Sequence, residues 1–312
     1  MSYTSTQPPF LIGAYASTNG ELDSQEEYYE LLAAEPWVGG LEVPYLATGL
    51  REDPAWFAER MAAAPEFAVN VLTPIPGVMS HIADRTWGIA SRDRDGRAAA
   101  LAFLRAAADA MCDINDRLGR RFFHFLALHT APQKEAHSEA LLRSLEELLS
   151  WDIDGAALTI EHCDAWSYEH PVEKGFLQLR EELAVIAEIG EASTGGLYSS
   201  LNWGRSAIEG RSADLPLEHI QTVAASGYLG GVILSGAQDR SDGMWGPWVD
   251  AHIGLHEHQP ESVLTEGAAR QAFAAALAGN PRYIGAKISI STGANSERIA
   301  RLRELAALAG RA

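Results

Sequence analysis

The sequence predicts a (β/α)8 barrel, the TIM-barrel fold, and three observations support that prediction. Eight short apolar runs alternate with longer stretches of helical period along the 312 residues. Connections from helix to strand are short, whereas several connections from strand to helix are long. The segment "GAYASTNG" after the first run lacks the glycine patterns of dinucleotide and phosphate loops. An open doubly wound sheet is therefore the weaker alternative, and no nucleotide cofactor is expected.

The eight apolar runs are the expected barrel strands, because each is short and is followed by a helical pattern. They cover residues 10–16, 38–46, 67–73, 122–130, 156–162, 196–203, 230–236 and 283–290. Residues 1–9 are expected to form a flexible tail, and residues 10–312 a single barrel domain.

The stretches between the runs carry helix signals. One helix opens at Ser24 among acidic residues, a second has a long alanine-rich amphipathic pattern, and a third ends at Gly190. A fourth ends at "GNP", a glycine stop followed by proline. The helices that these signals define are 24–34, 98–118, 174–189, 265–278 and 295–309.

Four strand-to-helix connections are long, at residues 74–95, 163–173, 204–213 and 237–263. Long loops without structure of their own are uncommon unless they have a function. In a barrel they gather at the carboxyl ends of the strands, the face on which active sites are built. The loop asymmetry therefore predicts where the site lies.

Composition narrows the choice of partners and compartment. Acidic residues outnumber basic ones 42 to 24, and a net charge of -18 opposes binding to nucleic acid or to anionic membrane surfaces. No apolar run of 18 residues and no signal-peptide pattern occurs. With only Cys112 and Cys163, a reduced cytoplasmic protein is a better expectation than a disulfide-bonded one.

Polar residues are confined to the expected strand ends, where they would face the site. They are Glu42, Asn70, His129, Glu161, Asn202, Ser235 and Lys287. Each could merely satisfy its polar neighbours, but a whole ring beneath long loops favours a ligand site.

The fifth strand ends in "TIEHCDAW". Because side chains alternate along a strand, Glu161 and His162 point in opposite directions while the strand persists. We expect Glu161 in the site, with His162 or Asp164 reaching it from the turn. Cys163 is expected to pack rather than to act as a nucleophile.

The sixth strand leads into "LNWGRSAIEGRS", which supplies candidate substrate-binding residues. Arg205 and Arg211 could clamp an anionic or polar group, beside Asn202, Trp203 and Glu209. In the alternative, the arginines pair with Glu209 and only tie down the loop.

The loop after the seventh strand contains "MWGPWVDAHIGLHEH". Asp250 and His252 face one side of an extended chain, so they could bind a metal or form an acid–base pair. Trp248, with Trp245, offers a flat face for a sugar ring or anchors a lid.

Lys287 ends the eighth strand in "GAKISI". A lysine in a barrel mouth needs a partner, and Glu161 is the expected one. Such a lysine could have a lowered pKa and act as a base, a Schiff-base former or an electrostatic stabiliser.

The stretches "IEHCDAW", "NWGRSAIEGR" and "WVDAH" resemble the xylose-isomerase-like TIM barrels, and most closely a bacterial family in that superfamily classed as a domain of unknown function. Compared with the four metal ligands of ketose 3-epimerases, only Glu161 matches. Asn202, Ser235 and Lys287 stand at the other positions. The resemblance therefore leaves two alternatives. A divalent ion (Mn, Zn, Co or Mg) has moved toward Glu161, Asp250 and His252, or Lys287 occupies its place.

The resemblance implies an enzyme that abstracts a proton next to a carbonyl of a sugar derivative, as in isomerisation, epimerisation or elimination. Glu161, His162, His252 and Lys287 would be catalytic, and the carbohydrate would contact Glu42 and His129 as well as the sixth-strand residues. A homodimer is possible. The alternatives are a metal-dependent hydrolase and a non-catalytic sugar-binding barrel with a decayed metal site.

Overall fold

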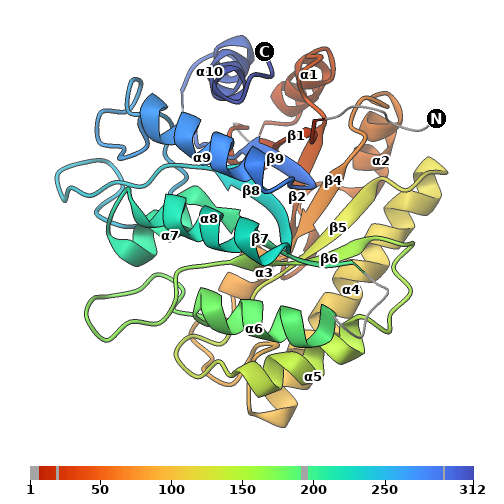
Figure 1. The fold of residues 1–312 in the computed structure, drawn as a ribbon. Coiled ribbons are helices and arrows are strands. Elements are labelled where there is room, and N and C mark those ends of the chain that lie inside the picture. Colours follow the sequence, from red (N-terminus) through yellow and green to blue (C-terminus); the bar gives the residue numbers. More distant parts are fainter. Residues whose placement is uncertain (1–6, 19–20, 191–195, 291) are drawn as a thin grey trace.

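The computed structural model describes residues 7–18, 21–190, 196–290 and 292–312. Within these residues eight parallel strands form a closed ring, which confirms the predicted TIM barrel (Figure 1). The ring closes because β1 pairs with both β2 and β9. Its strands are β1 (Phe10–Ile12), β2 (Gly40–Leu46), β4 (Asn70–Thr73), β5 (Phe123–Leu128), β6 (Ala157–His162), β7 (Leu197–Asn202), β8 (Leu229–Leu234) and β9 (Tyr283–Ala286). A two-residue strand, β3 (Gly49–Leu50), pairs antiparallel with the end of β2.

Several strands are shorter than the apolar runs that predicted them. The run 10–16 leaves the sheet after Ile12 and forms a 3-10 turn, η1 (Ala14–Ala16), and the run 283–290 leaves it after Ala286. The run 67–73 joins the sheet only at Asn70. Of the expected tail, residues 1–6 lie outside the described residues. Pro8 and Pro9 contact the barrel through carbonyls that accept hydrogen bonds from Arg311 and Ile284.

Eight helices of the described chain surround the strands. They are α1 (Leu22–Ala33), α2 (Pro54–Ala62), α4 (Arg94–Leu118), α5 (Ser138–Leu148), α6 (Leu179–Gly190), α8 (Leu215–Ser226), α9 (Glu266–Ala278) and α10 (Asn295–Leu308). Asp53, Asp93 and Thr265 cap α2, α4 and α9 by accepting hydrogen bonds from free backbone N–H groups. None of the described helices is both long and apolar enough to cross a membrane.

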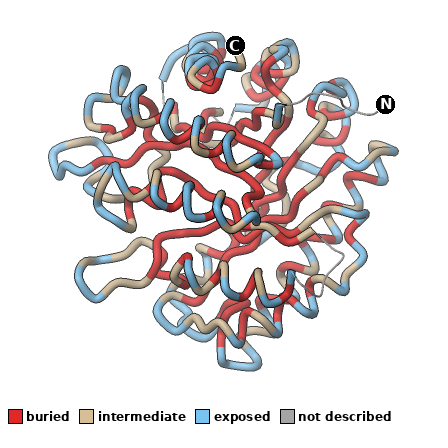
Figure 2. The backbone as a smooth tube through the Cα atoms, in the orientation of Figure 1, coloured by how far each residue is buried: buried red, intermediate tan, exposed pale blue. Residues whose placement is uncertain are grey.

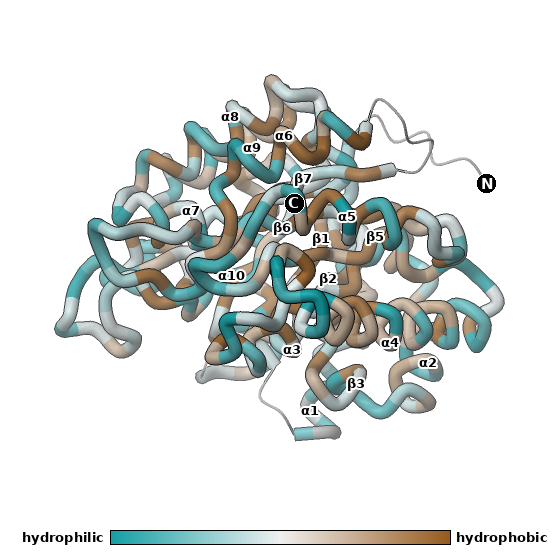
Figure 3. Tube along the Cα trace, turned by 90° about the horizontal axis from the view of Figure 1, so that it is seen from below, coloured by the Kyte–Doolittle hydropathy of each residue, from teal (hydrophilic) through white to brown (hydrophobic). Residues whose placement is uncertain are grey.

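Alternation along the strands separates two hydrophobic layers. The smaller layer fills the barrel interior and comprises Leu11, Val71, Phe125, Ala127, Ile233 and Tyr283. The intervening strand residues belong to the larger layer between strands and helices. Figure 2 shows buried backbone along the strands and exposed residues on the outer turns of the helices, and Figure 3 shows hydrophobic and hydrophilic residues alternating along the helices. Every second residue of a strand points into the barrel, and these inward positions continue toward the carboxyl ends. There Ala127 is followed by His129, Ala157 by Glu161, and Tyr283 by Lys287. The interior therefore changes from apolar to ionisable at that end of the barrel.

Two long connections contain short helices, so their prediction as loops was wrong. The segment 204–213 is mostly helix α7 (Trp203–Gly210), and the segment 74–95 contains α3 (Ile75–Met79). The Asn202 side chain starts α7 by accepting a hydrogen bond from the Arg205 N–H (3.3 Å). The loops after β6 and β8 extend on the left in Figure 1, away from the labelled N-terminus.

Gly40 shows how tightly the barrel closes. A Cβ atom at this residue would lie 1.6 Å from the Val69 carbonyl oxygen, which belongs to the backbone and cannot turn aside. We expect Gly40→Ala to lower the free energy of unfolding by about 3 kcal/mol in urea denaturation. Gly267→Ala is the control, because the nearest atom is 3.7 Å away and the residue lies in helix α9. Equal stability of the two variants would contradict this account.

Candidate active site

Lys287 forms the first of three buried ion clusters at the carboxyl end of the barrel. Its Nζ donates to Glu42 Oε1 (2.6 Å) and to the Tyr15 hydroxyl (3.1 Å), and Tyr15 donates to Glu42 Oε1 (3.0 Å). Glu42 comes from β2, whereas Lys287 follows β9. The expected partner of Lys287 was Glu161, so that pairing was wrong.

Glu161 is the centre of the second cluster. Its Oε2 lies 2.8 Å from His129 Nε2, and its Oε1 lies 2.7 Å from Arg205 Nη1. His129 follows β5, Glu161 lies in β6, and Arg205 lies in α7. Asn202 contributes indirectly, because its cap fixes where α7 begins and therefore where Arg205 lies.

Asp250 is the centre of the third cluster and also connects it to the second. Its Oδ2 accepts from Lys174 Nζ (2.7 Å) and Arg205 Nε (3.1 Å), and its Oδ1 lies 3.1 Å from His252 Nδ1. Arg205 thus bridges Glu161 and Asp250. We call the residues of the three clusters the barrel-mouth network: Tyr15, Glu42, His129, Glu161, Lys174, Arg205, Asp250, His252 and Lys287.

The barrel-mouth network balances charge inside the protein. The carboxylates Glu42, Glu161 and Asp250 face three cationic side chains, Lys174, Arg205 and Lys287, each at most 2% exposed. Burial opposes ionisation of such groups, and only close partners of opposite charge keep them ionised. The network therefore holds fixed charges around the mouth.

Glu161, Asp250 and Lys287 are held in their charged forms. Burial would raise the pKa of Glu161, but Arg205, Lys287 and His129 outweigh it and keep that pKa well below the usual range. Burial would lower the pKa of Lys287, but Glu42 outweighs it and the pKa is raised. The expectation of a lowered lysine pKa was therefore wrong, and Lys287 is a permanent cation rather than a base.

The two histidines of the network are held neutral. Burial lowers the pKa of His129 despite Glu161, and it lowers the pKa of His252 despite Asp250. His129 Nδ1 has no hydrogen-bond partner among the described residues. His252 has a backbone φ of 53°, a left-handed conformation that is uncommon outside glycine and often found at functional sites. Neutral imidazoles among fixed cations can accept a proton.

The metal site expected at Glu161, Asp250 and His252 does not fit this arrangement. Both oxygens of Glu161 are in contact with His129 or Arg205, and one Asp250 oxygen accepts from Lys174 and Arg205. A divalent ion within about 2.2 Å of these oxygens would lie against a guanidinium and an ammonium group. The charge that such an ion would supply is already present in the side chains.

His162 and Glu209 lie outside the barrel-mouth network. The expectation that His162 reaches Glu161 was therefore wrong, and Glu209, expected to bind substrate, lies beside His162 instead. His162 points outward from β6, with Nδ1 2.8 Å from Glu182 Oε2 and Nε2 2.9 Å from Glu209 Oε2. Burial disfavours its charged form, but Glu182 and Glu209 raise its pKa to about 10. His219 Nε2 approaches the other Glu209 oxygen at 3.7 Å.

The other expected contact residues have local roles in the structure. Trp203 is part of the hydrophobic core, and the half-buried Trp248 packs against that core. Arg211 is exposed and donates to the Pro171 carbonyl, which ties the loop rather than entering the network. Asn70 begins β4 at the opposite end of the barrel and bonds backbone groups there, so its expected place at the site was wrong.

Two network residues were missed from the sequence. Tyr15 lies in η1, where the alternation of a strand no longer applies, so strand periodicity gave no signal for its side chain. Lys174 was assigned to a helix, but α6 begins only at Leu179. Asp164 explains this difference, because its Oδ2 accepts from the backbone N–H groups of 173, 174 and 175 and holds that segment in a loop.

Cys163 is expected to be chemically inert in the folded protein. It is 1% exposed, and burial raises the pKa of its thiol to about 12 although Arg205 and Lys174 act in the opposite direction. In a Cys112→Ala protein, the remaining thiol should react with an aromatic disulfide reagent at pH 8 only after denaturation. Rapid reaction of the native protein would contradict the assignment of Cys163 to packing.

A family model described as "Domain of unknown function (DUF4862)" matches residues 11–303. The chain belongs to this family. A curated relative, an uncharacterized protein of Salmonella typhimurium, is 31% identical over an alignment of 289 residues that covers 89% of each chain.

The fold of this member of the DUF4862 family is similar to the folds of several solved TIM barrels. A D-tagatose 3-epimerase-like protein matches with a TM-score of 0.61 and 12% identity over 97% of this chain and 98% of the other. A xylose isomerase-like TIM barrel/4-hydroxyphenylpyruvate dioxygenase fusion protein matches with a TM-score of 0.60 and 13% identity over 96% of this chain, which spans 42% of the fusion protein. At these identities the likeness shows the fold alone.

Proposed function

We propose that the protein is an enzyme that removes a proton from the carbon next to a carbonyl group in a sugar derivative. The observation that supports this most directly is the pair of neutral imidazoles, His129 and His252, beside the buried cations Arg205 and Lys287. Proton abstraction needs a base and an adjacent positive charge for the oxygen that becomes negative. The fold shared with an epimerase-like protein is consistent with such a reaction.

In this proposal His252 is the base. Its ring lies beside Asp250, which stabilises the imidazolium that forms when the proton is taken. His129, held by Glu161, is the second acid–base group: its Nδ1, which has no partner among the described residues, takes the proton of a substrate hydroxyl and returns it to the neighbouring substrate oxygen, while the His252 imidazolium returns its own proton to carbon. Glu161 itself is too firmly ionised by Arg205 and Lys287 to be an effective base, so its role is to orient His129 and Arg205.

Lys287 supplies the positive charge that stabilises an enediolate oxygen. Its ammonium has three N–H donors, of which two bond to Glu42 and Tyr15, so one remains for the substrate. A fixed ammonium can perform here the electrostatic task of a metal ion. The residues of the mouth thus support proton transfer without a divalent ion, and a metal-dependent hydrolase is the weaker alternative.

Product analysis tests the proposal. The purified protein is incubated with aldoses, ketohexoses and 3-keto-glycosides, with and without a chelator, and the products are separated by chromatography. We expect an isomer, an epimer or an elimination product from at least one compound, at the same rate in both samples. Hydrolysis that requires added metal would overturn the proposal in favour of a hydrolase, and calorimetric binding of these compounds without turnover would overturn it in favour of a non-catalytic barrel.

A further inference from the structure

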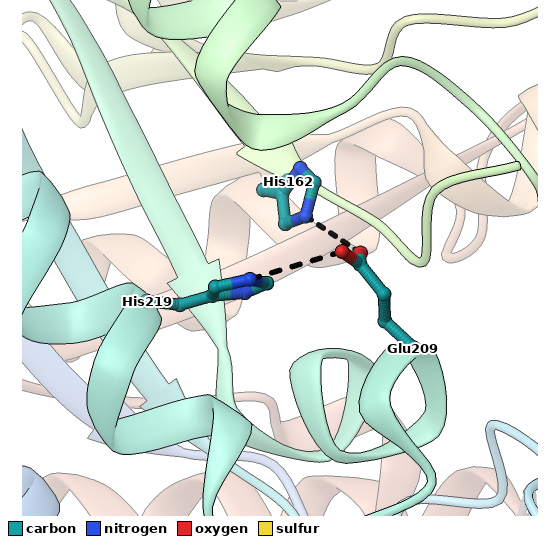
Figure 4. A group of neighbouring side chains, drawn as sticks. All are labelled: His162, Glu209 and His219. Carbon is teal, nitrogen blue, oxygen red and sulfur yellow. Dashed lines mark hydrogen bonds and ion pairs between the residues drawn. The ribbon is translucent and has the colours of Figure 1, made fainter.

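A second group of ionisable side chains lies on the outer side of the barrel wall. His162 is the last residue of β6 and points away from the interior, Glu209 lies near the end of α7, and His219 lies in α8 (Figure 4). One potential ligand atom from each lies within 4.8 Å of the other two. The barrel-mouth network does not include these residues.

We propose that His162, Glu209 and His219 bind a divalent first-row transition-metal ion such as zinc. The His162 Nε2–Glu209 Oε2 distance is 2.9 Å, and the His219 Nε2–Glu209 Oε1 distance is 3.7 Å. Two ligands of a tetrahedral zinc ion lie about 3.4 Å apart, between these values. Small side-chain movements would therefore bring all three ligand atoms to bonding distance.

In each of the two histidines, the ring nitrogen that would not bind the metal already has a hydrogen-bond partner. His162 Nδ1 pairs with Glu182 Oε2 (2.8 Å), whose other oxygen accepts from Thr130, and His219 Nδ1 pairs with Ser206 Oγ (3.0 Å). A histidine ligand needs such a partner, because a proton fixed on one nitrogen leaves the other free for the metal. Both rings present Nε2 toward Glu209.

Charge and ligand type favour a transition-metal cation. Two carboxylates, Glu182 and Glu209, enclose the His162 ring, and a dication that displaces the Nε2 proton of His162 would compensate their negative charge. Two imidazoles and one carboxylate suit zinc and its neighbours better than calcium or magnesium, which prefer oxygen ligands. The side chains of His219 and Glu209 remain 11% and 15% exposed, so an ion can reach them from solvent.

Such an ion would fix three elements that carry the barrel-mouth network. It would join the end of β6, which contains Glu161, to α7, which contains Arg205, and both to α8. We therefore assign it a structural role in holding these three elements together, whereas the charges of the barrel-mouth network come from side chains and do not need it. This inference does not depend on the proposed reaction.

Zinc binding by the full-length protein tests the inference. Protein freed of metal with a chelator is titrated with zinc chloride by calorimetry, and zinc per chain is then measured by elemental analysis. We expect one equivalent in the wild type and affinity at least 100-fold weaker in His219→Gln, which should fold because the described contacts of its ring are few. His258→Gln is the matched control, since His258 pairs with Glu304 on the surface.

Two results would overturn the inference. One is the absence of a zinc equivalent in the wild type, and the other is equal zinc affinity in the wild type and His219→Gln. An Asp250→Asn variant identifies where any remaining zinc binds. In the second case, loss of zinc from that variant would locate the ion in the barrel mouth instead.

Discussion

Replacing Lys287 with methionine is expected to lower kcat about 1,000-fold and to reduce the free energy of unfolding by about 3–5 kcal/mol. The loss of activity follows because the charge that stabilises the enediolate is removed. The loss of stability follows because the Glu42 carboxylate, 4% exposed, would remain buried without its cation. Turnover with the natural or best surrogate substrate and urea unfolding measure the two effects.

The double variant Lys287→Met, Glu42→Gln separates the two effects. Removing the unpaired carboxylate should recover most of the lost stability, because a neutral amide is less costly to bury than a charge. Activity should not return, because the positive charge is still missing. Recovery of turnover in the double variant, or undiminished turnover in Lys287→Met, would remove Lys287 from the mechanism.

Replacing Arg205 with methionine is expected to be the most damaging change to stability among the network residues. Arg205 contacts Glu161 at 2.7 Å and Asp250 at 3.1 Å, and it is 1% exposed. Its loss would leave two buried carboxylates short of positive charge, at a cost of about 3–5 kcal/mol or more. Urea unfolding at neutral pH measures this cost.

Arg211→Met is the matched control for that experiment. Arg211 lies six residues further along, is exposed, and donates to the carbonyl of Pro171. Surface substitutions of this kind change stability by about 0.5 kcal/mol or less. Similar losses in the two variants would contradict the assignment of Arg205 to the network and of Arg211 to the loop.

Strand alternation explains why much of the fold and part of the site could be predicted. Apolar runs separated by helical patterns define a barrel, and the inward series along each strand leads to Glu42, His129, Glu161 and Lys287 at the carboxyl end. The same alternation shows that His162 faces outward. Its assignment to the interior required the strand to end one residue earlier than it does.

The rest of the site depends on contacts that periodicity does not encode. Lys287 pairs with Glu42, 245 residues away in the sequence, because ring closure through β1 brings the two together. Asp250 contacts Lys174 only because Asp164 holds the segment before α6 in a loop. Helix α7 was missed because its eight residues are too short for a helical period to stand out.

Incorporation of deuterium from heavy water tests the central claim most directly. The wild type and a His252→Gln variant are incubated in D2O with the sugar derivative that is turned over fastest, and deuterium at the carbon next to the carbonyl is measured by NMR. Proton abstraction by His252 predicts deuterium at that carbon with the wild type and none above the uncatalysed background with the variant. Equal incorporation by both proteins, or a product formed by the wild type without solvent deuterium, would contradict it.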